Sequence, residues 1–147
     1  MTITKKIEQG FGNGVNGLYD CLKWLNDVPA NAVITVGATH TDTIAATIQL
    51  YDYLGNELAV AGTVMAYLAS DADGLDMNTT ALTTDMAIVT DGSLQILLAS
   101  KVYLLTSEAD GDIGITISYT TGALNFYLVL VMPNGKRIVS SAFAFTA

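Results

Sequence analysis

The stretch Thr43-Ile44-Ala45-Ala46-Thr47-Ile48-Gln49-Leu50-Tyr51 alternates between apolar residues and small or polar ones. Successive side chains of a strand point to opposite faces, so a period of two predicts a β-strand with one buried face. The buried face would carry Ile44, Ala46, Ile48 and Leu50. The stretch Asp112–Tyr119 repeats the pattern, and here Ile113, Ile115, Ile117 and Tyr119 are predicted to point inward.

Further apolar runs, separated by turn residues, lie on both sides of these two stretches. We expect strands at Asn31–Val36, Thr63–Ala69, Met86–Val89, Ser93–Leu98, Lys101–Thr106, Asn125–Met132 and Arg137–Thr146. The Asn125–Met132 run is apolar on both faces, which indicates a central strand or one that a partner covers. About nine short strands without a long helix between them predict an all-β antiparallel sandwich or barrel and disfavour a βαβ fold.

Two connections stand out between these strands. The pair Asp91-Gly92 separates two apolar runs, and because Asp-Gly favours the tight turn of a β-hairpin, we predict that the flanking strands pair. The segment Ser70–Asp85 is polar and rich in Asp and Thr, so we expect a long loop there.

Residues 1–29 differ from the rest of the chain. Apolar residues recur there at intervals of three and four, typical of one helix face, but four glycines between residues 10 and 17 oppose a helix. We therefore predict a loose N-terminal arm, a short helix over about Val15–Asp27 that Pro29 ends, and a separate sandwich domain at 30–147. So short a helix must dock, either on its own sandwich or on another subunit. The predicted partner contacts are Phe11, Leu18, Leu22, Trp24 and Leu25.

Composition and charge exclude several classes of protein. The 147 residues are 51% hydrophobic and only 14% charged, with a net charge of −8. Six basic residues against fourteen acidic ones disfavour binding to nucleic acid or to an anionic membrane surface. We also expect no transmembrane helix and no secretory signal, because neither a long apolar run nor an apolar core behind Lys5 and Lys6 is present.

The residues that could carry chemistry are few. His40 is the only histidine and Cys21 the only cysteine, so we expect no catalytic residues, no cofactor and no intrachain disulfide. Two acidic turns, Asp71-x-Asp73-Gly74 with Asp76 and Glu108-x-Asp110-Gly111-Asp112, leave two interpretations open. They are plain turns stabilised by local hydrogen bonds, or they hold a weakly bound calcium ion.

Several motifs match known β-sandwich proteins. The strand Thr43–Leu50, the turn Asp52-Tyr53-Leu54-Gly55-Asn56 and the turn Thr90-Asp91-Gly92 resemble the bacterial immunoglobulin-like repeat of the invasin and intimin type. Three other motifs make the chain from Val33 onward similar to small immunoglobulin-like virion proteins of tailed bacteriophages. They are Tyr67-Leu68-Ala69-Ser70-Asp71, Ser107-Glu108-Ala109-Asp110-Gly111-Asp112 and Leu130-Val131-Met132-Pro133-Asn134-Gly135.

The phage resemblance implies an immunoglobulin-like sandwich that serves as a structural virion protein and not as an enzyme. A capsid decoration or cement protein on the outside of the head is the expected form. It would bind the major capsid protein or other virion proteins and form a closed homo-oligomer such as a trimer. The alternative is an adhesion module on a tail or fibre that binds host carbohydrate or protein through the Ser70–Asp85 loop.

Overall fold

The structure is a computed structural model that describes residues 25–146, and within this range it confirms the expected all-β antiparallel sandwich. It contains ten strands: β1 (Asn31–Val36), β2 (Thr43–Tyr51), β3 (Thr63–Ala69), β4 (Thr84–Thr90), β5 (Ser93–Leu98), β6 (Val102–Thr106), β7 (Asp112–Ser118), β8 (Leu124–Val131), β9 (Arg137–Val139) and β10 (Phe143–Phe145).

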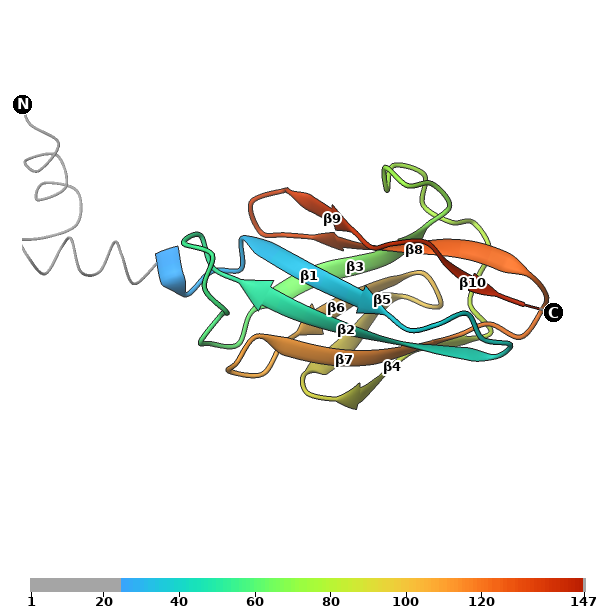
Figure 1. Cartoon of the computed structure of the whole chain (residues 1–147), viewed down its shortest axis with the longest axis horizontal. Helices are drawn as coiled ribbons and strands as arrows, with labels where there is room; N and C mark the ends of the chain where they lie inside the picture. The colour runs from blue at the N-terminus through green and yellow to red at the C-terminus, as the bar shows by residue number, and fades with distance from the viewer. Residues whose placement is uncertain (1–24, 147) are drawn as a thin grey trace, which may run out of the picture.

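The strands form two antiparallel sheets that pack face to face (Figure 1). One sheet has the order β1-β2-β7-β4, and the other has the order β10-β8-β3-β6-β5. The short strand β9 also pairs with β8, beside β10 on the same edge. The immunoglobulin-like architecture thus leaves β1 and β4 at the edges of one sheet, and β10 and β5 at the edges of the other.

The core lies between the sheets and consists of the residues that the alternating pattern predicted. Ile44, Ala46, Ile48 and Leu50 of β2 are buried, as are Ile113, Ile115 and Ile117 of β7 and the following Tyr119. Their counterparts in the facing sheet include Val64 and Ala66 of β3 and Tyr103 and Leu105 of β6. At one end of the sandwich, Tyr119, Phe126, Phe143 and Phe145 form an aromatic cluster with ring centroids 5.5–6.2 Å apart.

Strand β8 is central, which confirms the first of the two interpretations of its apolar sequence. It lies between β3 on one side and β9 and β10 on the other. Its outward-facing Val129 is fully buried by residues of this chain. The loop after β3 covers this residue, since a Cβ added to Gly74 would lie 3.0 Å from a Val129 methyl group.

The predicted hairpin at Asp91-Gly92 is wrong. Strand β4 pairs with β7, whereas β5 pairs with β6 in the other sheet, so the turn crosses between the sheets. Asp91 (φ 44°) and Gly92 (φ 97°) do adopt the left-handed conformation that the pair predicts. The Asp-Gly pair therefore predicts the local backbone conformation, but it does not predict which strands pair.

The final predicted strand, Arg137–Thr146, divides into β9 and β10. The break is at Ser140, whose Oγ accepts a hydrogen bond from the backbone N–H of Leu128 at 2.9 Å. The Ser140 side chain therefore bonds to β8 at the point where the chain leaves β9 and before it enters β10. Ten strands therefore replace the expected nine.

The N-terminal predictions fall mostly on residues that lie outside the described range. Helical conformation is seen at residues 25 and 26, directly before the chain enters β1. Of the five predicted partner contacts, Phe11, Leu18, Leu22 and Trp24 precede residue 25, and Leu25 alone is described. Among the described residues, no helix has the length and apolar character needed to cross a membrane.

Candidate interaction surface

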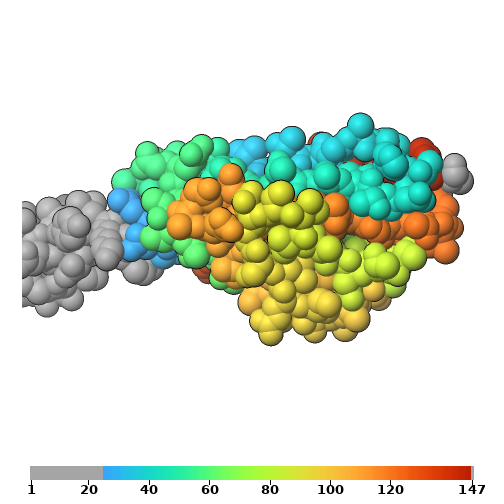
Figure 2. Space-filling view, turned by 90° about the horizontal axis from the view of Figure 1, so that it is seen from below, coloured from blue at the N-terminus to red at the C-terminus, as the bar shows by residue number. Residues whose placement is uncertain are grey.

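Large apolar side chains are exposed at nine positions in the described part of the chain, and four of them lie on the strand segments that flank the β4–β5 turn. These four are Val89 on β4 and Ile96, Leu97 and Leu98 on β5, which are 60%, 47%, 51% and 50% exposed. We call them the β5 edge surface. Figure 2 views the molecule from this side, and the yellow to golden segment that contains β4, β5 and β6 projects from the body. Three of the four, Ile96, Leu97 and Leu98, are consecutive on β5, and a concentration of exposed apolar side chains commonly marks an interaction site.

The exposure follows from the position of β5 at the edge of its sheet. β5 pairs with β6 and with no other described strand. Ile96 pairs with Tyr103, which is fully buried, yet Ile96 itself is 47% exposed because no strand within residues 25–146 lies on its far side. A β-bulge between Ile96 and Leu98 interrupts the ladder and leaves Leu97 as the extra residue. The sequence does carry a signal for this surface, because the alternation of Ser93–Leu98 breaks down in its last three, consecutively apolar residues.

A half-buried carboxylate connects the β5–β6 turn to the opposite sheet. Oδ1 of Asp85, on β4, accepts hydrogen bonds from the hydroxyl of Tyr103 at 3.0 Å and from the backbone N–H of Ser100. Ser100 has a left-handed backbone (φ 59°), and this turn places its N–H beside the carboxylate. Burial, followed by the nearby Asp85 carboxylate, raises the pKa of Tyr103 well above its usual range. The turn that follows β5 is therefore held against β4 by the Asp85 carboxylate.

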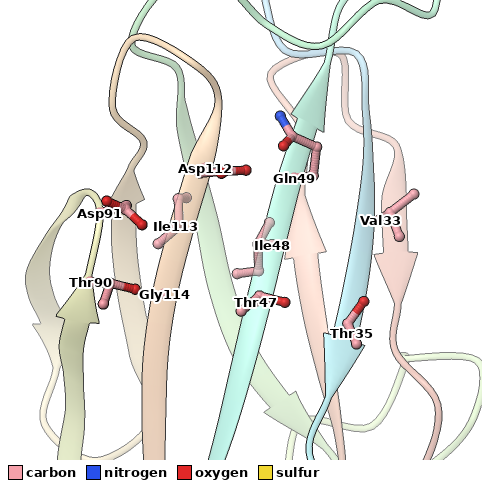
Figure 3. A pocket seen from close by; sticks show the side chains of 10 residues that line it. All are labelled: Val33, Thr35, Thr47, Ile48, Gln49, Thr90, Asp91, Asp112, Ile113 and Gly114. Carbon is pink, nitrogen blue, oxygen red and sulfur yellow. The ribbon is translucent and has the colours of Figure 1, made fainter.

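A shallow groove of about 340 Å³ lies on the outer face of the β1-β2-β7-β4 sheet (Figure 3). Its lining is mainly threonine and aliphatic, with Asp91 and Asp112 at one end and Gln49 across from them on β2. Partial burial raises the pKa of Asp112, and the negative charges of Asp110, Asp91 and Glu57 raise it further. These carboxylates repel one another, so this end of the molecule has a locally unfavourable concentration of negative charge.

The acidic turns form local hydrogen bonds. The carboxylate of Asp71 accepts hydrogen bonds from the backbone N–H groups of Leu75 and Asp76 at 3.1 Å. At the second turn, Asp110 accepts one from the N–H of Asp112. Within residues 25–146 no group of three or more His, Cys, Asp and Glu side chains is arranged to hold a metal ion. The local bonds match the plain-turn interpretation of the sequence.

The remaining residues that the sequence singled out are His40, Cys21 and the five predicted partner contacts. His40 is exposed in the loop after β1, and its carbonyl accepts a hydrogen bond from the N–H of Thr146. Leu25 is half-buried, and its carbonyl accepts a hydrogen bond from the N–H of Tyr53 at 3.4 Å. Cys21 lies outside the described residues, as do the other four predicted contacts. Of the described residues, His40 lies beside Phe145 and Leu25 beside Tyr53, so neither belongs to the β5 edge surface.

The predicted Ser70–Asp85 loop is ordered by contacts with its own sandwich. The Tyr67 hydroxyl donates a hydrogen bond to the carbonyl of Gly74 at 2.5 Å, and the N–H of Asn78 bonds to the carbonyl of Leu68. Leu75 and Met77 remain exposed on it. The loop ends at residue 83, because β4 begins at Thr84, two residues earlier than the sequence predicts.

Comparison with known proteins leaves the family of the chain open. No family model matches it, and no curated protein matches it. Among solved structures, a cohesin module from a family 33 glycoside hydrolase of Clostridium perfringens ATCC13124 is similar, with a TM-score of 0.43 and 11% sequence identity. The match covers 81% of this chain and 96% of that module. A likeness at this level does not bear on function.

Proposed function

We propose that this chain is a non-enzymatic structural protein of a bacteriophage particle, and that it binds other proteins of the particle as a capsid decoration protein. The observation that carries the proposal is the β5 edge surface, on which Val89, Ile96, Leu97 and Leu98 are each about half exposed or more. Burying a large apolar side chain contributes roughly 1.5–3 kcal/mol, so covering even part of this surface would stabilise an assembly.

The charge distribution adds to this argument. Residues 25–146 contain three basic and twelve acidic side chains, a net charge of −9. No residue of β5 itself is charged. A partner can therefore cover this strand without removing a charge from water, which is the costly step when charged surfaces are buried. The acidic remainder of the body would keep the protein soluble and would favour basic surfaces of a shell.

The virion assignment rests on the resemblance of the sequence to phage immunoglobulin-like proteins, and the head is the expected location. The motif Leu130–Gly135 belongs to this resemblance and forms the tight turn between β8 and β9. The second motif, Ser107–Asp112, forms the turn between β6 and β7. Both turns lie at the same end of the sandwich as the chain entry into β1 (Figure 1).

Immunogold electron microscopy of purified phage particles tests the proposal. The antibody is raised against residues 30–147, and particles that lack the gene serve as the control. Gold particles distributed over the head are the expected result. Labelling confined to the tail would replace the decoration role with the adhesion alternative, in which the exposed Leu75 and Met77 of the 70–83 loop become the contact to test. Intact particles without label would overturn the virion assignment.

A further inference from the structure

We propose that the β5 edge surface binds a second copy of this chain, with β5 paired antiparallel to β5 about a two-fold axis close to Ile96. This inference deepens the proposed function, on which it rests, by naming the partner of that surface.

The edge of β5 is open to a further strand. β5 has hydrogen-bonded strand neighbours on its β6 side only, within the described residues. Its sequence, Ser-Leu-Gln-Ile-Leu-Leu, contains neither a proline nor a charged residue, two of the features that protect an edge from pairing, although a β-bulge at Leu97 interrupts this edge. Unpaired backbone groups of such an edge can pair with another strand. Two identical strands that pair antiparallel are related by a two-fold axis, which produces a closed dimer.

The charges that flank β5 are complementary to themselves. Asp91 precedes the strand and Lys101 follows it, and each is five residues from Ile96. Antiparallel pairing about a two-fold axis close to Ile96 brings the Asp91 end of each β5 beside the Lys101 end of the other. Neither side chain forms an ion pair within residues 25–146. The two-fold axis would create two such pairs and would bring a positive charge to the carboxylates of Asp91 and Asp112.

The same register covers the exposed apolar side chains. It places the two copies of Ile96 opposite each other across the axis, and it brings the apolar end of β5 that contains Leu97 and Leu98 beside Leu94 of the second copy. Directly opposed strand residues have Cβ atoms about 4.5–5.5 Å apart, which is close enough for these side chains to contact. Because residues 25–146 carry a net charge of −9, two copies repel over most of their surface. The repulsion between two copies is weak at β5, because the strand is uncharged and the basic Lys101 follows it.

The interface is short. The bulge between Ile96 and Leu98 limits the regular part of the ladder, so few backbone hydrogen bonds can form between the copies. We therefore expect a dissociation constant on the order of micromolar, as for small interfaces. The dimer should be visible at high protein concentration and should dissociate on dilution.

Disulfide trapping tests the register. In the full chain with the single cysteine replaced (Cys21→Ser), Ile96→Cys is compared with Val33→Cys. Val33 is 52% exposed on the outer face of the other sheet, which makes it a matched control. Opposed residues of antiparallel strands lie within the Cα separation that a disulfide spans, so Ile96→Cys should oxidise to a covalent dimer at least tenfold faster than the control. Equal rates would overturn the proposal.

Light scattering over a hundredfold range of protein concentration tests the state of the unmodified chain. The expected result is a monomer that becomes a dimer as the concentration rises. Ile96→Lys should abolish the dimer, whereas the control Val33→Lys should not. Lys101→Glu should weaken the dimer by about fivefold or more, because it turns two attractive contacts into repulsive ones.

The outcomes separate this inference from the proposed function. A monomer at every concentration, or a dimer that Ile96→Lys leaves intact, would overturn β5 pairing. In either case the gold labelling of particles would be unaffected. If the chain is monomeric and the introduced thiol of Ile96→Cys resists alkylation, a segment of the same chain covers β5, and the second copy is again excluded. Circular dichroism of each variant, together with its melting temperature, shows that a lost dimer is not a lost fold.

Discussion

The hydroxyl of Tyr103 donates a hydrogen bond to the carboxylate of Asp85, with the two oxygen atoms 3.0 Å apart. Tyr103 lies on β6 and Asp85 on β4, so this bond joins the two sheets of the sandwich. The same carboxylate oxygen accepts the N–H of Ser100 in the β5–β6 turn. Because Tyr103 is fully buried, its hydroxyl cannot exchange this bond for one with water.

Replacing Tyr103 by phenylalanine should therefore destabilise the protein. The substitution removes a hydrogen bond to a charged group while keeping the ring, and we expect the free energy of unfolding to fall by about 1.5–3 kcal/mol. Urea unfolding measures the change. Tyr127→Phe is the matched control, because the half-buried Tyr127 forms no hydrogen bond through its hydroxyl within the described residues. Equal losses in the two variants would show that the Asp85 contact contributes nothing specific.

The same contact predicts a loss of stability at alkaline pH. Burial and then the Asp85 carboxylate raise the pKa of Tyr103 above its ordinary value of 10.0. Between the ordinary and the raised pKa, the unfolded chain has lost this proton and the native protein retains it. Stability therefore falls as the pH rises above about 10, while the contribution of Tyr103 is intact below that pH. Unfolding measured across this range should show a smaller fall in Tyr103→Phe than in the unmodified protein.

The turn between β4 and β5 should tolerate no side chain at Gly92. An alanine there would have the left-handed backbone (φ 97°), and its Cβ would lie 2.6 Å from the carbonyl oxygen of Thr106. Gly55→Ala measures the cost of the left-handed backbone alone, because Gly55 has a similar φ of 84° but open space around its Cβ position. We expect Gly55→Ala to cost about 1 kcal/mol and Gly92→Ala at least about 1 kcal/mol more. Thermal unfolding of both variants tests whether Gly92→Ala lowers the stability more than Gly55→Ala does.

Neutralising Asp112 should stabilise the protein at neutral pH. Partial burial and the charges of Asp110, Asp91 and Glu57 raise the pKa of Asp112, so its ionised form is disfavoured in the native state. A raised pKa means that stability is lost as the pH rises through it, and Asp112→Asn removes that loss. The melting temperature at pH 7 should increase in this variant, and less so in high salt, which screens the repulsion. Asp42→Asn, at an exposed aspartate elsewhere, should change little.

Calcium should have no effect on the stability of this sandwich. The Asp71 carboxylate is occupied by the N–H groups of Leu75 and Asp76, and the residue thereby holds its turn without an ion. We expect the same melting temperature with millimolar calcium and with a chelator. A rise in melting temperature with calcium that Asp71→Asn abolishes would restore the calcium interpretation of this turn.

Individual strands could be predicted well from the sequence, and the reason is local. β2 has one buried and one largely exposed face, and β7 has one buried and one mostly half-buried face, so the period of two is visible in their residues. β8 was predicted as apolar on both faces, and it is covered by neighbours on both. The interaction surface was harder to predict. The three consecutive apolar residues Ile96–Leu98 break the alternation of the strand, but their exposure depends on the edge position of β5 in its sheet, which a run of apolar residues does not specify.

The sequence by itself determined the class of the fold, the positions of most strands and which face of each is buried. Only the tertiary structure decided which strands pair. Thr43 lies opposite Ser118, and Ser93 opposite Thr106, whereas the strands joined at Asp91-Gly92 lie in different sheets. The physical reason is that strand pairing uses backbone N–H and C=O groups, which almost every residue carries. The choice among partners is therefore made by the packing of the whole core, and that choice also leaves β5 at an open edge.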